Sequence, residues 1–436
     1  MQSVKIGVLG LGTVGSGTVN VLRRNIKEIT RRAGRDIEIS RAADRDFDTP
    51  KNCNTDGIAL TMDAHDIVCD PEIQVVVELI GGTGIARELV LEAIANGKHV
   101  VTANKALIAL HGNELFARAQ EKGVTIAFEA AVAGGIPIIK AMREGLAANR
   151  IEWLAGIING TGNFILTEMR DKGRDFADVL TEAQALGYAE ADPTFDVEGI
   201  DAAHKLTIMA SIAFGIPLQF DKAYTEGISK IAQEDVKYAS ELGYRIKHLG
   251  IAKKTAQGVE LRVHPTLIPQ RRLLANVDGV MNAVLVKGDA VGPTLYYGAG
   301  AGSEATASAV VADIVDVVRA LTTDPENRVP HLAFQPDALA DTPILSMSEV
   351  VTSYYLRIHT EDKPGVLADI TRILGDQGIS IEAILQKQPE DHNGNVPIIM
   401  LTQEIAEKNM DAAIAQIEAL NTVNDSVMRI RMESLK

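Results

Sequence analysis

An acidic stretch that ends in a single lysine offers the clearest chemistry in this chain. Residues 187–205 read GYAEADPTFDVEGIDAAHK, with five carboxylates before Lys205. Asp201 and Lys205 are four residues apart on a helix predicted from 200 to 213, so they share one face. Such a pair is commonly a surface ion pair of little consequence. Here the helix also carries many apolar residues, which predicts that it is half-buried. A half-buried ammonium could give a proton to an oxygen that develops negative charge. The carboxylates of the acidic loop could bind the ammonium group of a substrate.

Two further charged residues follow predicted strands. Lys105 comes after a strand at 99–102, at the carboxyl edge where parallel sheets bind ligands, although an ordinary surface lysine is the alternative. Glu129 is the only charged residue between Lys122 and Lys140. With the backbone carbonyls of the Gly-Gly-Ile-Pro turn it could hold a cation, but a hydrogen-bonded or helix-capping glutamate fits the composition equally well.

The elements that must position these residues begin with a dinucleotide-binding pattern. A strand at 4–9, the sequence GLGTVG at 10–15 and a helix at 17–29 follow one another. In this arrangement the glycines allow a tight turn and close backbone approach, and the helix N-terminus faces a pyrophosphate. A second strand, at 37–43, ends in Asp44-Arg45. Since an acidic residue there binds the ribose hydroxyls of NAD and an arginine accepts the 2′-phosphate of NADP, both cofactors remain open.

The remaining predicted elements complete the organisation of the chain. A third strand, 75–80, is apolar except for Glu78 and leads into glycines at 81–84, which suit a loop beneath a cofactor. A strand at 151–158 precedes NGTGN at 159–163, which we interpret as a ligand loop before a helix from about 164. After residue 349 we expect strands at 353–359, 379–388, 395–403 and 426–432. One helix would open with residues 362–367 and run to about 377, and another would cover 408–420. The order βαββαβ is typical of a small ferredoxin-like domain.

Composition excludes several classes of protein. The chain has 436 residues, enough for two or three domains, and a formal net charge of −15. This charge argues against nucleic acid and anionic membrane surfaces as partners. Two cysteines without a disulfide framework favour the cytoplasm. Because the first strand starts within the first residues, we expect no signal peptide.

Several long motifs resemble bacterial homoserine dehydrogenase, and the match extends over essentially the whole chain. They are GLGTVG (10–15), ANKAL (103–107), EAAVAGGIPII (129–139), NGTGN (159–163), the stretch 187–205 and YYGAGAGSEATASAVVADI (296–314). The resemblance implies NAD(P)H-dependent reduction of L-aspartate 4-semialdehyde to L-homoserine, on the route to threonine, methionine and isoleucine. DKPGVLADI at 362–370 resembles the start of an ACT domain, a module that binds amino acids at subunit interfaces.

The resemblance also implies roles for individual residues. Lys205 matches the general acid/base and Lys105 a second lysine near the nicotinamide. Substrate would be held by Glu190, Asp201 and Asp196. A sodium ion would be held by Glu129 and the carbonyls of Val132, Gly134 and Ile136. The cofactor, NADP or NAD, would contact Gly10, Gly12, Thr13, Val14, Gly15, Arg45, Thr83, Lys105 and Gly302.

These observations predict an α/β chain of three domains. We expect a Rossmann-type NAD(P)-binding domain at 1–130, with a returning segment near 300–330. An α+β substrate-binding, catalytic and dimerisation domain would follow at 131–320, then a linker at 321–348. A ferredoxin-like ACT domain would occupy 349–436. A homodimer or homotetramer is expected, with threonine acting through the ACT domain, unless that domain serves assembly alone.

Two other functions compete with this prediction. One is an amino-acid sensor with an inactive nucleotide domain, which the presence of both Lys105 and Lys205 disfavours. The other is a dehydrogenase for a different amino-acid aldehyde or hydroxy acid, which substrate screening would separate.

Overall fold

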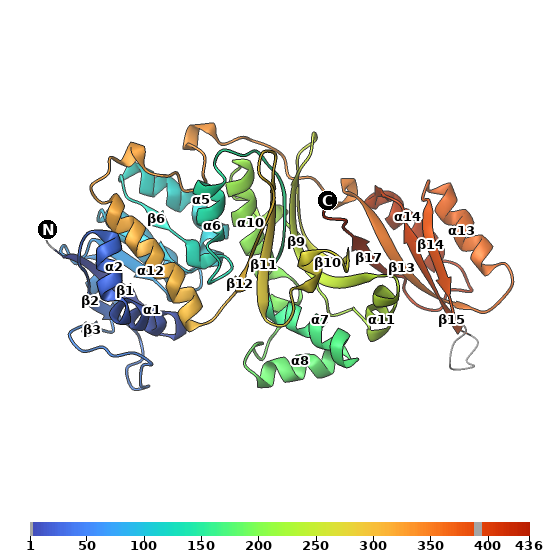
Figure 1. Ribbon diagram of the computed structural model, residues 1–436, viewed down its shortest axis with the longest axis horizontal. Helices are drawn as coiled ribbons and strands as arrows, with labels where there is room; N and C mark the ends of the chain where they lie inside the picture. Colours follow the sequence, from blue (N-terminus) through green and yellow to red (C-terminus); the bar gives the residue numbers. More distant parts are fainter. Residues whose placement is uncertain (1–2, 388–394) are drawn as a thin grey trace. The chain divides into compact units, whose positions relative to one another are not determined.

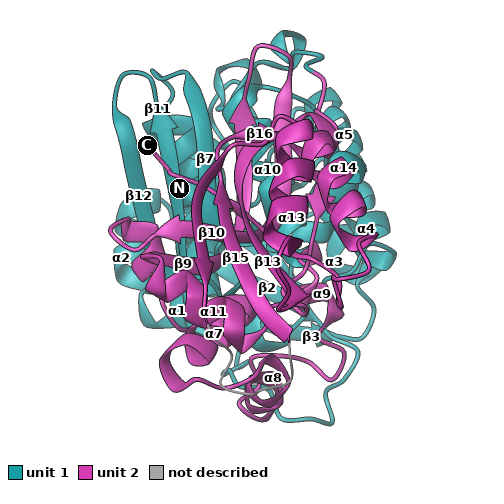
Figure 2. Cartoon of the chain, turned by 90° about the vertical axis from the view of Figure 1, so that its right-hand side faces the viewer, with its two compact units in different colours: residues 1–160, 201–223, 280–342 teal, residues 161–200, 224–279, 343–436 magenta. Residues whose placement is uncertain are grey.

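The structure is a computed structural model that describes residues 3–387 and 395–436. The chain divides into two compact units (Figure 2). Unit 1 comprises residues 1–160, 201–223 and 280–342, and unit 2 comprises residues 161–200, 224–279 and 343–436. Each unit is therefore built from segments that are distant in the sequence.

Unit 1 contains a six-stranded parallel sheet in the order β3-β2-β1-β4-β5-β6 (Figure 1). Its strands are β1 (Val4–Leu9), β2 (Ile37–Ala43), β3 (Ala59–Thr61), β4 (Val75–Glu78), β5 (His99–Thr102) and β6 (Ile126–Ala127). This order is that of the Rossmann fold, which confirms the predicted nucleotide domain. The strands β4 and β5 are buried along their whole length, as expected for a parallel sheet that is covered on both faces.

Helices from two segments of the chain pack on this sheet. The first segment supplies α1 (Thr13–Arg24), α2 (Ile26–Ala33), α3 (His65–Val68), α4 (Ile85–Ala95) and α5 (Lys105–Glu121). The returning segment supplies α12 (Ser303–Ala320), whose apolar residues share one core with α1, α2 and β1. The predicted return of the chain to the nucleotide domain is therefore present in unit 1.

The prediction of one helix over 17–29 is wrong in its bounds. The helix α1 begins at Thr13, and α2 follows after a break at Asn25. Glycines inside α1 suggested a loop, but close packing needs them there. A Cβ at Gly15 would lie 2.0 Å from the Gly10 carbonyl oxygen, and a Cβ at Gly17 would lie 2.5 Å from the Ser303 Oγ.

The rest of unit 1 surrounds a buried helix. The antiparallel strands β7 (Ile151–Ile157), β11 (Met281–Gly288) and β12 (Gly292–Ala299) pair in the order β12-β11-β7. Short turns, α6 (Ile138–Lys140) and the π-helical η2 (Ala141–Gly145), follow the loop after β6. The helix α10 (Ile200–Phe214) is buried at nearly every position from residue 201 onward, as its apolar sequence predicted.

Unit 2 is built on one sheet in the order β9-β10-β17-β13-β15-β14. Its strands are β9 (Tyr244–Lys254), β10 (Val259–Pro269), β17 (Met428–Met432), β13 (Val351–Glu361), β15 (Asn395–Thr402) and β14 (Ile381–Gln386). With α13 (Val366–Asp376) and α14 (Glu407–Glu418), the last four strands form the predicted βαββαβ fold. Because β17 pairs in parallel with β10, this fold is continuous with the β9–β10 hairpin.

Both faces of the C-terminal sheet are covered within unit 2. Tyr354 and Leu356 on β13 pack with α13 and α14. The intervening Tyr355 packs on the opposite face with α7 (Gly160–Lys172), α8 (Phe176–Ala185) and α11 (Gln233–Glu241). The apolar character of both faces of β13 follows from this arrangement.

The predicted loop at 159–163 is wrong at its C-terminal side, since α7 begins at Gly160 rather than near residue 164. Polar side chains in its first turns find partners in unit 2. Thr161 Oγ1 donates to the Tyr188 carbonyl (2.6 Å), and Asn163 Nδ2 donates to the carbonyls of Val277 (3.1 Å) and Gly279 (2.9 Å). Small polar residues therefore anchor a helix here.

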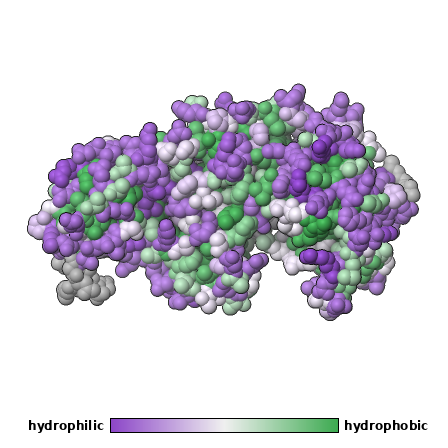
Figure 3. Space-filling model, turned by 180° about the vertical axis from the view of Figure 1, so that it is seen from behind, coloured by the Kyte–Doolittle hydropathy of each residue, from purple (hydrophilic) through white to green (hydrophobic). Residues whose placement is uncertain are grey.

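The face of the molecule drawn in Figure 3 is largely polar. On the face shown in Figure 3, hydrophilic residues prevail and apolar ones form small groups between them. Within the described residues, no helix combines the length and apolar character that crossing a bilayer requires.

Candidate active site

Three charged side chains meet inside unit 1. Lys205 Nζ lies 2.6 Å from Asp201 Oδ2 and donates to the Ile158 carbonyl (2.7 Å). Lys105 Nζ lies 3.2 Å from Asp201 Oδ1. Asn159 Nδ2 donates to Asp201 Oδ2 (3.0 Å). Asp201 is buried, so the alternative of a solvated surface pair is wrong.

Local sequence explains how each group reaches this point. Asp201 and Lys205 are one turn apart on α10, as their spacing predicted. Lys105 is the first residue of α5, directly beyond the carboxyl end of β5. Asn104 fixes that helix start, because its Oδ1 accepts the backbone N–H of Leu107 (3.1 Å).

The electrostatics of the cluster favour an ionised Asp201. Complete burial alone would raise the Asp201 pKa, but the ammoniums of Lys205 and Lys105 lower it to about 2. Burial lowers the pKa of His204 to about 4, and its ring stacks on Phe220 with the centroids 4.2 Å apart. The cluster thus places two lysines around one ionised carboxylate. Its surplus positive charge suits an oxygen that becomes negative during a reaction.

Glu78 organises the loop beside Lys105, and the sequence interpretation assigned it no role. The Glu78 side chain is completely buried. One carboxylate oxygen accepts the backbone N–H groups of Ile80 (2.8 Å) and Gly81 (3.0 Å), and the other accepts Thr102 Oγ1 (2.6 Å). A lone carboxylate in an otherwise apolar strand was the signal, because a buried charge requires such partners.

The same network reaches the start of α5. The Asn104 backbone N–H donates to Thr102 Oγ1 (3.0 Å), and Asn104 Nδ2 donates to the Gly82 carbonyl (2.6 Å). The loop after β4, which contains Thr83, is thereby tied to the strand end that presents Lys105. One set of hydrogen bonds therefore positions both Thr83 and Lys105, the two cofactor contacts predicted here.

The glycine loop fits a dinucleotide. Gly10 has φ +97°, and a Cβ there would lie 2.9 Å from the Leu79 carbonyl oxygen. A Cβ at Gly12 would meet nothing within 4 Å, so the backbone borders open space in front of the α1 N-terminus. Thr13 and Val14 form the first turn of that helix and Gly15 packs against Gly10. Backbone N–H groups are thus available to a pyrophosphate.

A cleft of about 460 Å³ continues from the glycine loop to the end of β2. Gly12, Asp44 and Arg45 line it, and Arg45 is exposed. Asp44 Oδ2 accepts the Leu11 backbone N–H (2.7 Å), and its Oδ1 lies 3.2 Å from Lys51 Nζ. Burial opposes ionisation of Asp44, but backbone hydrogen bonds and Lys51 lower its pKa. Asp44 therefore already stabilises the glycine loop.

Gly302 stands at the start of the returning helix. It is the residue before α12 and has φ +123°, a backbone conformation that favours glycine. The next residue, Ser303, donates its hydroxyl to the Thr13 carbonyl (2.8 Å). The returning segment therefore meets the glycine loop, as its predicted cofactor role requires.

Glu129 is buried after β6 with both carboxylate oxygens engaged. They accept the backbone N–H groups of Ile139 and Lys140, each at 2.8 Å. Burial and the neighbouring Asp313 raise the Glu129 pKa to about 7. The backbone carbonyls predicted as cation ligands lie nearby in sequence, where Ala133 (φ +55°) and Gly134 (φ +48°) turn the chain. Each carboxylate oxygen of Glu129 has a second lone pair. The two hydrogen bonds from Ile139 and Lys140 therefore leave the carboxylate able to bind a cation.

Other parts of the predicted sodium and substrate sites are less complete. The Ile136 carbonyl accepts the Ile138 N–H (2.7 Å). No cluster of three or more His, Cys, Asp or Glu side chains suited to a metal occurs among the described residues. Glu190 is exposed and Asp196 is half-buried on α9 (Thr194–Val197), both in unit 2. Their roles toward substrate stay predictions.

Comparison with known proteins identifies the three parts of the chain. Residues 10–129 match the model of the homoserine dehydrogenase NAD-binding domain, residues 137–315 match homoserine dehydrogenase, and residues 354–422 match the ACT domain. A homoserine dehydrogenase from Pseudomonas aeruginosa is 69% identical over 435 residues, with complete coverage of both chains. One from Neisseria gonorrhoeae is 59% identical with the same coverage.

Solved structures agree with these matches. The crystal structure of a homoserine dehydrogenase from Thiobacillus denitrificans superposes with a TM-score of 0.95 at 68% identity, covering 100% of this chain and 99% of that one. A hyperthermophilic archaeal homoserine dehydrogenase in complex with NADPH gives a TM-score of 0.61 at 27% identity, covering 72% and 98%. The chain therefore belongs to the homoserine dehydrogenase family and is an NAD(P)-binding oxidoreductase with a C-terminal ACT domain.

Proposed function

We propose that the chain catalyses the reversible NAD(P)H-dependent reduction of L-aspartate 4-semialdehyde to L-homoserine, with Lys205 as the general acid/base. The arrangement of Lys105 and Lys205 around the buried Asp201 carries this proposal. It combines a proton donor, a second cation and the carboxylate that fixes both. A solvated surface ion pair does not account for the burial of Asp201.

The proposed mechanism assigns one task to each group. When bound, the cofactor supplies the hydride. Lys205 gives its proton to the oxygen of the substrate as that oxygen becomes an alkoxide, and takes it back in the reverse reaction. Lys105 stabilises the same oxygen by its charge. Asp201 and the Ile158 carbonyl hold the Lys205 ammonium in place, and Glu190 and Asp196 receive the ammonium of the substrate.

For the cofactor we propose that NADP(H) is preferred over NAD(H). Arg45 is exposed in the cleft beyond the glycine loop and could pair with a 2′-phosphate. Asp44, which would otherwise select the ribose hydroxyls, is engaged by the Leu11 N–H and neutralised by Lys51. Gly10, Gly12, Thr13, Val14 and Gly15 would cradle the pyrophosphate, with Thr83, Lys105 and Gly302 around the nicotinamide half.

We propose further that Glu129 binds sodium with the carbonyls of Val132, Gly134 and Ile136. Support comes from the raised pKa of the buried Glu129, since a carboxyl group that resists ionisation gains from a cation beside it. Sodium chloride should raise the melting temperature at pH 8 more than choline chloride at equal concentration. Glu129→Gln should abolish the difference between the two salts, and its persistence in this variant would exclude Glu129 as a ligand.

The remaining parts of the proposal concern regulation, assembly and location. We propose that threonine inhibits the enzyme through the ACT domain, in cytoplasmic biosynthesis of threonine, methionine and isoleucine. The proposed domains are 1–130 with the return near 300–330, then 131–320, the linker 321–348 and 349–436. The domain at 131–320 would also provide the contacts between subunits of a homodimer or homotetramer. The ACT match and the two free cysteines support these assignments.

The decisive experiment is L-homoserine-dependent reduction of NADP and of NAD by purified protein, each with and without L-threonine. We expect activity that is higher with NADP and lower when threonine is added. Activity without a threonine effect would leave the ACT domain an assembly module. No activity with either cofactor would overturn the proposed reaction and favour an amino-acid sensor.

A further inference from the structure

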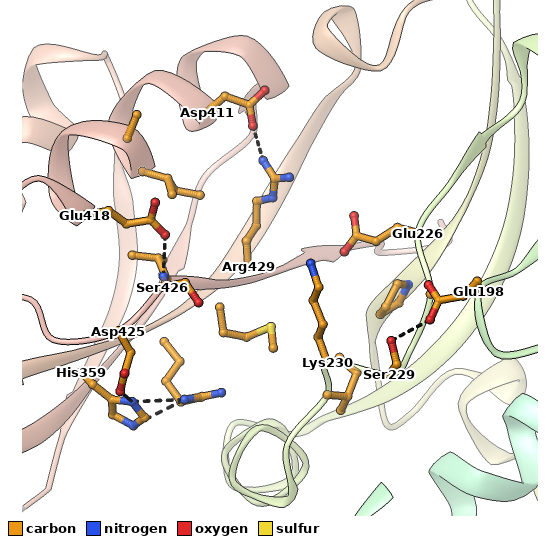
Figure 4. A pocket seen from close by; sticks show the side chains of 18 of the residues that line it. Glu198, Glu226, Ser229, Lys230, His359, Asp411, Glu418, Asp425, Ser426 and Arg429 are labelled. Carbon is orange, nitrogen blue, oxygen red and sulfur yellow. Dashed lines mark hydrogen bonds and ion pairs between the residues drawn. The ribbon is translucent and has the colours of Figure 1, made fainter. Parts of the chain in front are cut away.

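Unit 2 contains a wide cleft that the proposed chemistry does not use (Figure 4). Its volume is about 1040 Å³. One wall belongs to the ACT part of the chain and comprises β13, α14 and residues 425–429. The other wall comprises Glu198 and residues within 224–231. The loop at 362–365, which carries the DKPG motif, does not line this cleft.

Buried ion pairs hold the two walls together. Arg431 on β17 is completely buried and pairs with Glu226 on one wall (2.7 Å) and with Glu407 on α14. Arg357 on β13 donates from Nε and Nη2 to the two carboxylate oxygens of Asp235 on α11, at 2.7 and 3.0 Å. The Arg431 pairs join the two walls, and the Arg357 pair ties the ACT wall to α11, which lies outside the cleft lining. The cleft is therefore pre-organised for a ligand.

Several charges in the cleft are already neutralised, but within the described residues Lys230, Glu198 and Glu418 have no partner of opposite charge. Arg429 pairs with Asp411, and His359 lies 3.4 Å from Asp425. Lys230 is exposed, and none of the described residues forms an ion pair or hydrogen bond with its ammonium. Lys230, on the wall opposite α14, is therefore a cation that a ligand in the cleft could bind.

Glu198 offers the complementary charge from the same wall. Its Oε1 accepts Ser229 Oγ at 2.7 Å, and among the described residues no lysine or arginine pairs with it. Gly227 makes room for this carboxylate, since a Cβ there would lie 2.2 Å from Glu198 Oε2. A glycine and a serine thus position a carboxylate that has no cation of its own.

The segment around Glu198 leads directly into the catalytic helix. The Val197 carbonyl accepts the Ile228 N–H (2.9 Å), which joins this segment to the wall of the cleft. Gly199 has φ +85°, and a Cβ there would lie 3.1 Å from His248 Cε1, so the turn is tightly constrained. The helix α10 begins at the next residue and carries Asp201 and Lys205. A change at Glu198 is therefore close in the chain to the proposed acid/base pair.

We propose that this cleft binds a free α-amino acid, with the carboxylate of the ligand at Lys230 and its ammonium at Glu198. A zwitterion can pair with Lys230 and with Glu198 at the same time, which neither a simple anion nor a simple cation does. Binding alters activity through residues 197–199 at the start of α10. This inference rests on the regulatory role proposed above for the ACT domain and gives that regulation a site.

The test compares full-length wild type with Lys230→Met and Glu198→Gln, and uses Lys408→Met as the control. Lys408 is an exposed lysine on α14 that does not line the cleft. The first measurement is the L-threonine concentration for half-inhibition of L-homoserine oxidation. The second is the shift in melting temperature with each of the common L-amino acids. Both cleft variants should need at least about tenfold more threonine, because each loses a charge-assisted contact. Lys230→Met and Lys408→Met should keep wild-type activity without threonine.

Each outcome separates the cleft from the proposed function. Equal inhibition of wild type and both cleft variants would overturn the cleft as the site and leave threonine regulation standing. If threonine does not inhibit wild type, the proposed threonine regulation is wrong. The melting temperatures then decide whether the cleft binds an amino acid. An amino acid that shifts wild type and Lys408→Met but not Lys230→Met would support the site. No shift with any amino acid would overturn the inference while leaving the dehydrogenase activity unaffected.

Discussion

Replacing Asp201 by asparagine removes the charge that holds two ammoniums together and keeps the size of the side chain. In the wild type, Asp201 lies 2.6 Å from the Lys205 ammonium and 3.2 Å from that of Lys105. In the variant two lysines would face each other without a counter-ion. We expect unit 1 to lose stability and the reaction to slow, because the proposed proton donor loses its anchor.

The size of the stability loss can be worked from the cluster. The Asp201 pKa falls from 3.8 to about 2 in spite of complete burial. At 1.36 kcal/mol for each pKa unit, this shift corresponds to about 2.5 kcal/mol of stability at neutral pH. Removing one partner of a buried ion pair typically costs about 3 to 5 kcal/mol. We therefore expect the free energy of unfolding to fall by about 3 kcal/mol at pH 7.5.

The effect should also depend on pH with a definite sign. Since the folded pKa is below the unfolded value, the contribution of Asp201 is complete above about pH 4 and is lost as the pH falls toward 2. The stability difference between wild type and Asp201→Asn should therefore be constant above about pH 5 and shrink at lower pH.

Urea unfolding followed by tryptophan fluorescence measures this difference. Trp153 is the single tryptophan and lies on β7, in the same unit as Asp201. Asp221→Asn, at an exposed position of that unit, is the matched control and should change stability little. A loss below about 1 kcal/mol for Asp201→Asn would refute the reasoning, because it would mean that water screens the cluster as it does surface pairs.

Three further substitutions test the separate tasks assigned to the site. Lys205→Ala should lower kcat by a factor of about 10² to 10⁴ and leave the dissociation constant for NADPH, measured by its fluorescence, nearly unchanged. Equal losses in both would contradict its role in proton transfer. Arg45→Ala should raise KM for NADPH about tenfold or more and leave KM for NADH unchanged, since only NADPH carries the 2′-phosphate. Glu78→Gln should raise KM for both cofactors by a similar factor, because it loosens the loop at 80–82. An effect confined to kcat would show that this loop does not bind the cofactor.

Local features of the sequence were sufficient to predict much of the nucleotide domain. The strands β1, β2 and β5 match their predicted bounds. β1 and β5 are short, largely apolar runs, and β2 begins with alternating apolar and polar residues, which is the pattern of a strand. The pairing of Asp201 with Lys205 was likewise predictable, since it depends on helical spacing alone.

Contacts between segments that are distant in the sequence could not be predicted from local sequence patterns. The approach of Lys105 to Asp201 and the hydrogen bond from Asn159 depend on how α5, α10 and the end of β7 pack. The early start of α7 depends on carbonyls at 277 and 279, more than a hundred residues away. Glycines and small polar residues indicate a loop by themselves, but in α1 and α7 tertiary contacts override that preference.

The place of β17 between β10 and β13 has a consequence for biosynthesis of the chain. Roughly 160 residues separate the end of β10 from the start of β17. During translation this edge of β10 stays unpaired until that later strand is made, apart from a short contact with β8 (Tyr224–Thr225). An open strand edge can pair with other chains. Nascent chains of this protein should therefore be most vulnerable to aggregation after the β9–β10 hairpin has emerged and before residues 428–432 arrive to close the sheet.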